Sequence, residues 1–274
     1  MSTPAIPRRE VDNSTSSTHA ATIEGSGVHI SIKAEKLFDV GGLPVTNGLV
    51  LSFIILILGC AAALLVRRKL ARIPGALQNI AEWVCEGILS LMDGILGNRR
   101  ESERYLPLIA TIFIIVLFSN WFGLLPGVGS ILFHGEETAP LFRAPSSDLN
   151  FTLALALISV ITVNILGVVA IGAGPHLKKF LNFSSPIGFF TGILEFVSEI
   201  ARIISFSFRL FGNIFAGEVL LTVISFLLPY LVPIPLFALE VFVWFIQAFI
   251  FAMLTLVFTG MAVQEHQHSH TVTK

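Results

Sequence analysis

Apolar residues occur along this chain in five long runs, which short polar and charged segments separate. A helix needs about 20 mostly apolar residues to cross the hydrocarbon core of a bilayer. Runs of about this length or longer cover residues 49–67, 105–125, 149–173, 185–226 and 236–263. The pattern therefore predicts an all-α integral membrane protein with about five transmembrane helices.

A further segment, residues 75–97, has a different pattern. Its apolar residues recur at steps of three and four, and most of its acidic and amide side chains fall elsewhere. The repeating positions are Leu77, Ile80, Val84, Ile88, Leu91 and Ile95. This spacing predicts an amphipathic helix at the cytoplasmic membrane interface, with Trp83 near the lipid headgroups. A re-entrant hairpin and a helix that docks on a partner protein are the alternatives.

The composition supports a membrane protein and excludes several other classes. Hydrophobic residues make up 54% of the 274 residues and charged residues only 13%, whereas soluble domains carry about 25% charged residues. Seventeen Lys and Arg nearly balance eighteen Asp and Glu, so no basic surface is available to bind nucleic acid. The two cysteines, Cys60 and Cys85, provide neither a disulfide scaffold nor a metal-ligand spacing.

The distribution of basic residues predicts the orientation, because basic loop residues favour the cytoplasmic side. The clusters are Arg67-Arg68-Lys69 after the first span, Arg99-Arg100 before the second and Lys178-Lys179 after the third. All three lie in the cytoplasm if the N-terminus is outside and the C-terminus inside. We therefore expect a polar extracytoplasmic tail over residues 1–45, one membrane domain over 46–265 and a cytoplasmic tail over 266–274. The N-terminal segment does not resemble a transit peptide, which favours a bacterial plasma (inner) membrane.

Ionisable residues interrupt the fourth apolar run, although an Arg at the centre of a span costs about 3 kcal/mol on insertion scales. These residues are Glu195, Glu199, Arg202, Arg209 and Glu218. Glu199 and Arg202 are three residues apart and can pair, and Glu195 can join them. Arg209 has no acidic residue one helical turn away, which predicts a surface that meets another protein. A helix of this run would be about 60 Å long, so it must be tilted, kinked or partly outside the bilayer.

A second polar stripe is expected where the fourth and fifth spans meet. Glu218 is nine residues beyond Arg209, so the two point to opposite sides of one helix, about 13 Å apart along its axis. Glu240 and Gln247 are seven residues apart and share a face with Trp244. Glu218 and Glu240 could share a proton, which implies a wet pathway. Small residues that would let another helix approach closely are Gly212, Ala216 and Gly217.

Two other groups of polar residues have more than one interpretation. His266, His268 and His270 could form a metal cluster, but an exposed tail explains them more simply. Asp148 and Asn150 stand before the third span, where they could cap the helix or provide an entry for ions.

The segment Phe208–Glu218, with the sequence Phe-Arg-Leu-Phe-Gly-Asn-Ile-Phe-Ala-Gly-Glu, resembles the signature of subunit a of F-type ATP synthases. Further matching segments follow the family's order along the chain. They are Ala34–Phe38, Pro44–Asn47, Gly123–Gly127, Asp148–Asn150, Gln247–Phe251 and Gln264–His266. The resemblance thus extends from about residue 30 to residue 266.

The resemblance implies a membrane stator that faces a rotating ring of c subunits, each with one buried carboxylate. Arg209 would match the family's essential arginine. The protein would carry protons through two offset half-channels to and from the c-ring, and so couple proton-motive force to ATP synthesis. It would bind no nucleotide, cofactor or metal, and perform no bond chemistry alone. Its implied partners are the c-ring, the peripheral-stalk b subunits, the lipid bilayer and the transported ion, H⁺ in preference to Na⁺.

Site residues carry over by position. Those matching the half-channel open to the outside are Asn213, Glu218, Glu240 and Gln247, and those matching the cytoplasmic exit are Glu195, Glu199 and Ser205. Some members have a histidine at one of the positions of Glu218 and Glu240, whereas both are glutamate here. A self-contained ion/proton antiporter is the alternative function, but the inverted repeats typical of such carriers are not visible.

Overall fold

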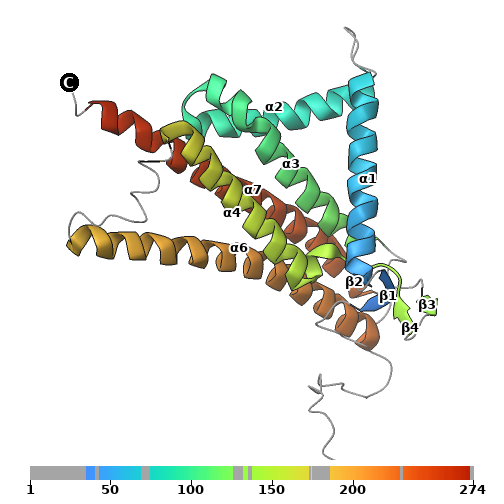
Figure 1. Cartoon of the computed structure of the whole chain (residues 1–274). Helices are drawn as coiled ribbons and strands as arrows, with labels where there is room; N and C mark the ends of the chain where they lie inside the picture. The colour runs from blue at the N-terminus through green and yellow to red at the C-terminus, as the bar shows by residue number, and fades with distance from the viewer. Residues whose placement is uncertain are drawn as a thin grey trace, which may run out of the picture. The chain divides into compact units, whose positions relative to one another are not determined.

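The computed structural model describes residues 35–40, 43–68, 75–125, 132–134, 138–172, 174, 186–228 and 231–271. Six long α-helices dominate this part of the chain (Figure 1). They are α1 (Asn47–Arg68), α2 (Ala76–Leu96), α3 (Arg99–Gly123), α4 (Leu149–Ile171), α6 (Pro186–Leu227) and α7 (Pro233–Thr271). The short elements are strands β1 (Lys36–Val40), β2 (Leu43–Thr46), β3 (Leu132–His134) and β4 (Thr138–Pro140) and the 3₁₀ turn η1 (Pro145–Ser147).

Five of the helices that the structure describes are long and apolar enough to cross a membrane, namely α1, α3, α4, α6 and α7. The predicted all-α membrane fold is therefore confirmed. The largest difference in a boundary is at the end of α7, which reaches Thr271, eight residues past the predicted run. Helix α3 begins at Arg99, six residues before its predicted run. Its first turn is polar and is capped by Asn98, whose side chain accepts a hydrogen bond from the Arg100 N–H at 3.0 Å. Hydropathy alone does not detect such a turn.

Helix α2 is one unbroken amphipathic helix, so a hairpin turn within residues 75–97 is excluded. It ends at Gly97, whose positive φ of 68° is a conformation that glycine adopts without steric cost. On one face Leu89 and Met92 are buried, whereas Trp83 is 79% exposed on another. This arrangement agrees with a helix that packs on the protein on one side and is open to a membrane surface or a partner on the other.

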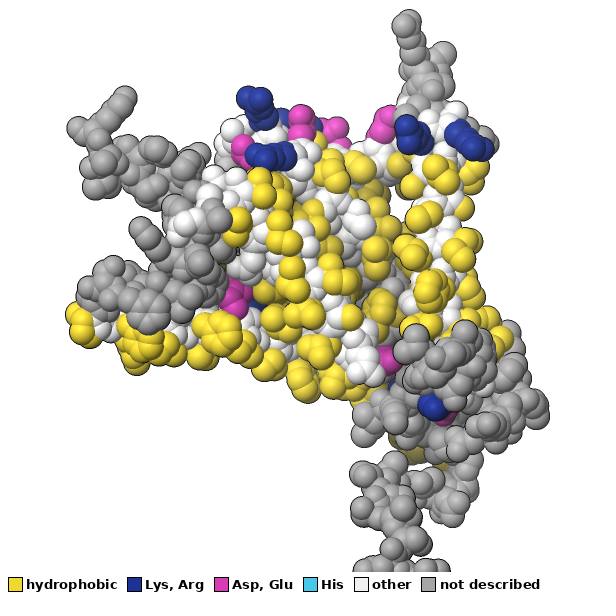
Figure 2. All heavy atoms as spheres, in the orientation of Figure 1, with side chains coloured by type: hydrophobic (Ala, Val, Ile, Leu, Met, Phe, Trp, Pro, Cys, Tyr) yellow, Lys and Arg dark blue, Asp and Glu magenta, His cyan; other side chains and the backbone are white. Residues whose placement is uncertain are grey.

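An ion-paired turn joins α2 to α3. Arg99 lies 2.9 Å from Asp93, 3.3 Å from Glu103 and 3.5 Å from Glu86. The Ser102 hydroxyl and the Arg99 guanidinium hold the pKa of Asp93 below its ordinary value. Figure 2 shows charged side chains gathered at this end of the molecule, near the end of α1, while apolar side chains cover the lengths of the helices.

The core lies where α3, α4, α6 and α7 pack together, and α2 contributes Met92 to it. Aromatic rings pack together there. The ring centroid of Phe206 on α6 lies 5.1 Å from that of Phe251 and 5.7 Å from that of Phe258, both on α7. Buried hydroxyls bond between helices, as in the 2.9 Å contact of Ser159 on α4 with Thr255 on α7. Such bonds hold membrane helices together, because lipid provides no hydrogen-bonding partner.

The buried residues of helix α1 lie near its start and are Asn47, Gly48, Leu51 and Ile55. The antiparallel hairpin of β1 and β2 leads into this end. Asn47 donates a hydrogen bond to the Pro140 carbonyl at 3.3 Å, which brings the end of the β3–β4 hairpin beside the start of α1. Both hairpins were missed by the sequence prediction, which expected no strands.

Candidate functional site

Arg209 lies on the exposed face of α6. The opposite face of the same turns is buried, through Phe206, Leu210 and Ile214. The Arg209 guanidinium donates a hydrogen bond to the Ser205 hydroxyl one turn earlier, at 3.3 Å. Within the part of the chain that the structure describes, no carboxylate forms an ion pair with Arg209. The side chain is thus a cation aimed away from its own protein.

On the C-terminal side of Arg209, α6 and α7 bring three of the predicted residues together. The Asn213 amide donates to the Gln247 side-chain oxygen at 2.6 Å. Glu240 is only 5% exposed and its carboxyl lies against Gly217, where a Cβ would be 2.6 Å from Glu240 Cδ. Gly217 is therefore a position where the absence of a side chain makes room for a buried carboxyl. A Cβ added at Gly212, by contrast, would meet no side chain or neighbouring segment of the described structure within 4 Å.

Glu218 has a partner that the sequence analysis did not identify. Arg143 Nε lies 3.5 Å from Glu218 Oε1, and the same Nε donates to the Ser147 hydroxyl at 3.0 Å. The Arg143 side chain is 9% exposed and that of Glu218 38%. Arg143, which lies between the second and third predicted spans, was assigned no role from the sequence. Nothing in its local sequence indicates that it reaches α6.

Several buried polar atoms in this region have no hydrogen-bond partner within the described residues. They are Glu218 Oε2, Glu240 Oε2, Gln247 Nε2, Trp244 Nε1, Asn120 Oδ1 and Ser146 Oγ. They come from η1, α3, α6 and α7. Leaving such a group unbonded costs about 1–3 kcal/mol, so buried polar groups normally bond protein or water. A cluster of this kind is typical of a region that water enters.

On the N-terminal side of Arg209, a second polar cluster links three helices. Arg202 of α6 forms an ion pair with Glu199 at 2.8 Å, as the three-residue spacing predicts. Asn164 of α4 donates to Glu199 at 3.3 Å, and the Arg202 guanidinium lies 3.9 Å from the ring centroid of Phe258 on α7. Glu195, one turn nearer the start of α6, is half-buried.

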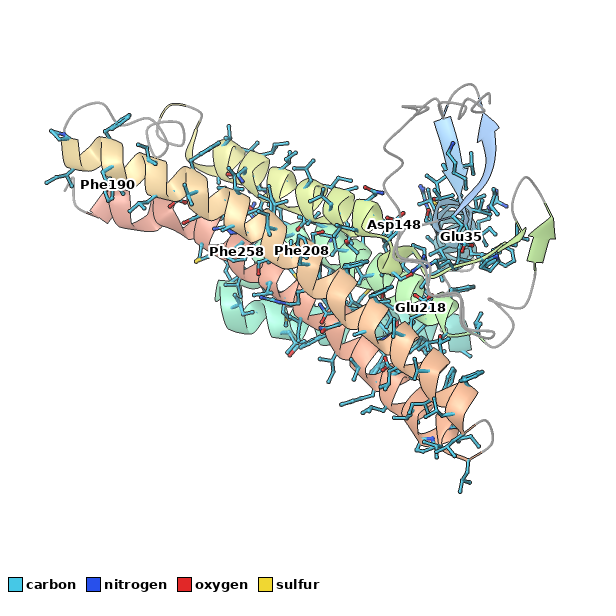
Figure 3. The ribbon with its side chains drawn as sticks, turned by 90° about the horizontal axis from the view of Figure 1, so that it is seen from below. Glu35, Asp148, Phe190, Phe208, Glu218 and Phe258 are labelled. Atoms are coloured by element: carbon cyan, nitrogen blue, oxygen red, sulfur yellow. The ribbon has the colours of Figure 1, made fainter. Side chains whose placement is uncertain are left out.

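The two clusters flank Arg209 along one helix. Figure 3 shows Phe208, the residue before Arg209, midway along α6, with Phe190 near one end and Glu218 toward the other. By helical rise, Glu195 is about 21 Å and Glu218 about 13 Å from Arg209 along the axis. Acidic groups thus approach the arginine from both ends of α6.

The capping interpretation of Asp148 is confirmed. Its carboxylate accepts a hydrogen bond from the Asn150 N–H at 2.9 Å, at the first turn of α4. The side chains of His266, His268 and His270 lie outside the described residues, so their interpretation stays a prediction.

Five apolar helices that pack on one another define a multi-pass integral membrane protein. The family model of the ATP synthase A chain matches residues 49–260. The chain therefore belongs to the ATP synthase A chain family, and it is a membrane subunit of an ATP synthase.

Curated relatives extend this finding to most of the chain. The ATP synthase subunit a of Campylobacter jejuni subsp. doylei is 37% identical over 219 residues, which cover 78% of this chain and 89% of the relative. That of Campylobacter concisus is 39% identical over 211 residues, with coverage of 76% and 86%. That of Moorella thermoacetica is 32% identical over 235 residues, with coverage of 86% and 99%.

Proposed function

We propose that the chain conducts protons between two offset half-channels and the c-ring of a rotary ATP synthase. The observation that carries this proposal is the exposed Arg209, which has no anionic partner among the described residues. An isolated cation within a span is costly and offers no stability to the isolated subunit. A carboxylate supplied by a neighbouring protein would offset that cost.

The surface around Arg209 suits a closely approaching helix. Ser205 and Ala216 are small and exposed on this side of α6, and Gly212 lies between them with open space at its Cα. Small residues let helix backbones come close together in a membrane. A ring helix with a buried carboxylate could therefore bring that group to the guanidinium.

The proposed mechanism follows from the charge of Arg209. A guanidinium beside a carboxylate favours its ionised form, so a ring carboxylate releases its proton as it reaches Arg209. Because arginine remains charged at every working pH, it also blocks direct passage of protons between the half-channels. Rotation of the ring would carry each protonated carboxyl group from one half-channel to the other along the lipid-facing side of the ring, away from Arg209.

The half-channel open to the outside would run through the cluster on the C-terminal side of Arg209. Glu218 is the most exposed of its carboxyls and Glu240 is buried beside it, next to Gly217. The bonded pair of Gln247 and Asn213 follows, and Asn213 is one helical turn from Arg209. We infer this order, from Glu218 through Glu240 to Asn213, as the route of proton entry.

The cytoplasmic half-channel would use Glu195, Glu199 and Ser205, on the N-terminal side of Arg209. With the N-terminus outside and the C-terminus inside, the basic end of α1 and the α2–α3 turn lie in the cytoplasm. The proposed setting is a bacterial inner membrane, with the c-ring and the b subunits as partners and H⁺ as the ion. A self-contained antiporter is less favoured, because it would need to neutralise Arg209 within its own chain.

The test is ATP-driven acidification of inverted membrane vesicles that contain the whole complex. Arg209→Ala should assemble but lose pumping, because the ring carboxylate then has no cation to release its proton. Arg100→Ala, which removes an exposed arginine at the start of α3, is the matched control and should pump normally. Normal pumping by assembled Arg209→Ala would refute the proposed mechanism.

A further inference from the structure

We propose that Arg143 is a positioning residue for proton uptake, which holds Glu218 at the outer end of the proton route. This inference rests on the proposed function and adds to the proposed proton route one residue, Arg143, that lies outside the five spans. The observation behind it is the ion pair of Arg143 with Glu218, which joins the segment before η1 to the C-terminal third of α6.

The position of Arg143 is built into the fold. Residues 143–147 are all buried. Gly123, the last residue of α3, makes room for this segment, since a Cβ there would lie 2.9 Å from Ala144 Cα. Gly48 of α1 faces the same segment, since a Cβ added there would lie 3.7 Å from Pro145 Cα. Helices α1 and α3 therefore hold the backbone that carries Arg143.

A hydrogen-bonded chain also fixes the direction of the guanidinium. Arg143 Nε donates to the Ser147 hydroxyl at 3.0 Å, and that hydroxyl donates to the Ala144 carbonyl at 2.9 Å. The carbonyl belongs to the residue next to Arg143, so the three groups form a compact loop. The Nε that bonds Ser147 is thus also the atom that lies beside Glu218 of α6.

The pair leaves Glu218 suited to exchange protons. Arg143 contacts Oε1, whereas Oε2 has no hydrogen-bond partner among the described residues. The Glu218 side chain is also partly exposed, unlike that of Glu240. Oε1 is therefore held by Arg143, while Oε2 is buried without a partner among the described residues and is the oxygen that a proton or a water would bond.

Among the described residues, Arg143 is the cation that contacts Glu218. Of the described residues on the elements packed against this part of α6, Asp148 before α4 and Glu240 on α7 are both acidic. Arg209 lies on α6 itself, about 13 Å away along the axis. Removing Arg143 would leave the Glu218 carboxyl with these acidic neighbours and without the cation that contacts it.

A purely structural role is the competing explanation, in which Arg143 only anchors the segment before η1. The two explanations differ in the response to external pH. The experiment uses the whole ATP synthase in liposomes and measures ATP synthesis at a fixed membrane potential. The pH that is varied, called the outer pH here, is that of the compartment into which the half-channel containing Glu218 opens. Rates are divided by the amount of assembled complex. The variants are Arg143→Gln, Arg143→Lys, Glu218→Gln and the double variant, with Arg100→Gln as the matched control.

We expect Arg143→Gln to lower the rate per complex and to move the half-maximal outer pH upward by about 1 unit, a tenfold change in proton concentration. Arg143→Lys keeps the charge and should restore the midpoint. In the Glu218→Gln background, Arg143→Gln should have no further effect, because the group that it acts on is gone.

Loss of assembled complex with an unchanged rate and pH profile in Arg143→Gln would overturn the inference, and so would independent effects in the double variant. Arg209→Ala is assayed alongside to separate the two proposals. Lost synthesis in Arg209→Ala with a normal Arg143→Gln would refute this inference alone. Normal synthesis in Arg209→Ala would refute the proposed function itself.

Discussion

Gly217 is the position where a single added methyl group should most disturb the proposed proton route. A Cβ there would lie 2.6 Å from Glu240 Cδ and closer still to one carboxyl oxygen. Contacts this short do not persist, so the Glu240 carboxyl must move by about 1 Å or more in Gly217→Ala. The moved atoms are the end of a flexible side chain, which keeps the cost in stability to about 1–3 kcal/mol.

The cost in function should be larger, because a displacement of about 1 Å in a reacting group can reduce a rate by about 100-fold. We expect Gly217→Ala to assemble in the complex and to lower ATP-driven proton pumping at least tenfold. Gly59→Ala is the matched control, since no atom lies within 4 Å of a Cβ at that position in α1. Glu240→Asp shortens the obstructing side chain and should partly restore pumping in the Gly217→Ala background. A normal pumping rate in assembled Gly217→Ala would show that the position of the Glu240 carboxyl is unimportant.

Two further variants test other contacts. Gln247→Leu removes the 2.6 Å hydrogen bond with Asn213. Proton flux through the reconstituted complex should fall at least tenfold, while the free energy of unfolding changes by only about 1 kcal/mol. An unchanged flux would exclude Gln247 from the proposed route. Asp93→Asn tests the α2–α3 turn, where Ser102 and Arg99 lower the pKa of Asp93. A lowered pKa stabilises the fold above the unfolded-state value, and this stabilisation is lost as pH falls through the folded-state value. Limited proteolysis between pH 7 and pH 3 should therefore show acid-dependent opening of this turn in the wild type and a weaker pH dependence in Asp93→Asn.

The sequence alone determined the spans, the amphipathic α2 and the lack of an acidic partner for Arg209 within one turn of its own helix. These features depend on neighbours within one or two helical turns, so hydropathy and helical periodicity are sufficient to detect them. The pair of Glu199 and Arg202 belongs to the same class, because residues three apart on a helix face each other. Polar first turns such as that of α3 were missed, because a capped charged turn has the composition of a loop.

Only the tertiary structure decided which helix faces meet. The pairing of Arg143 with Glu218 and the contact of Gly217 with Glu240 each join segments far apart in the sequence. Hydropathy places a helix in the membrane but does not fix its rotation about its axis, because lipid and protein neighbours are both apolar. That rotation comes from the packing of small residues and from hydrogen bonds between helices. The arrangement of Glu218, Glu240 and Gln247 is therefore a property of the packed bundle, whereas the lack of an acidic neighbour for Arg209 was already visible in the spacing of one helix.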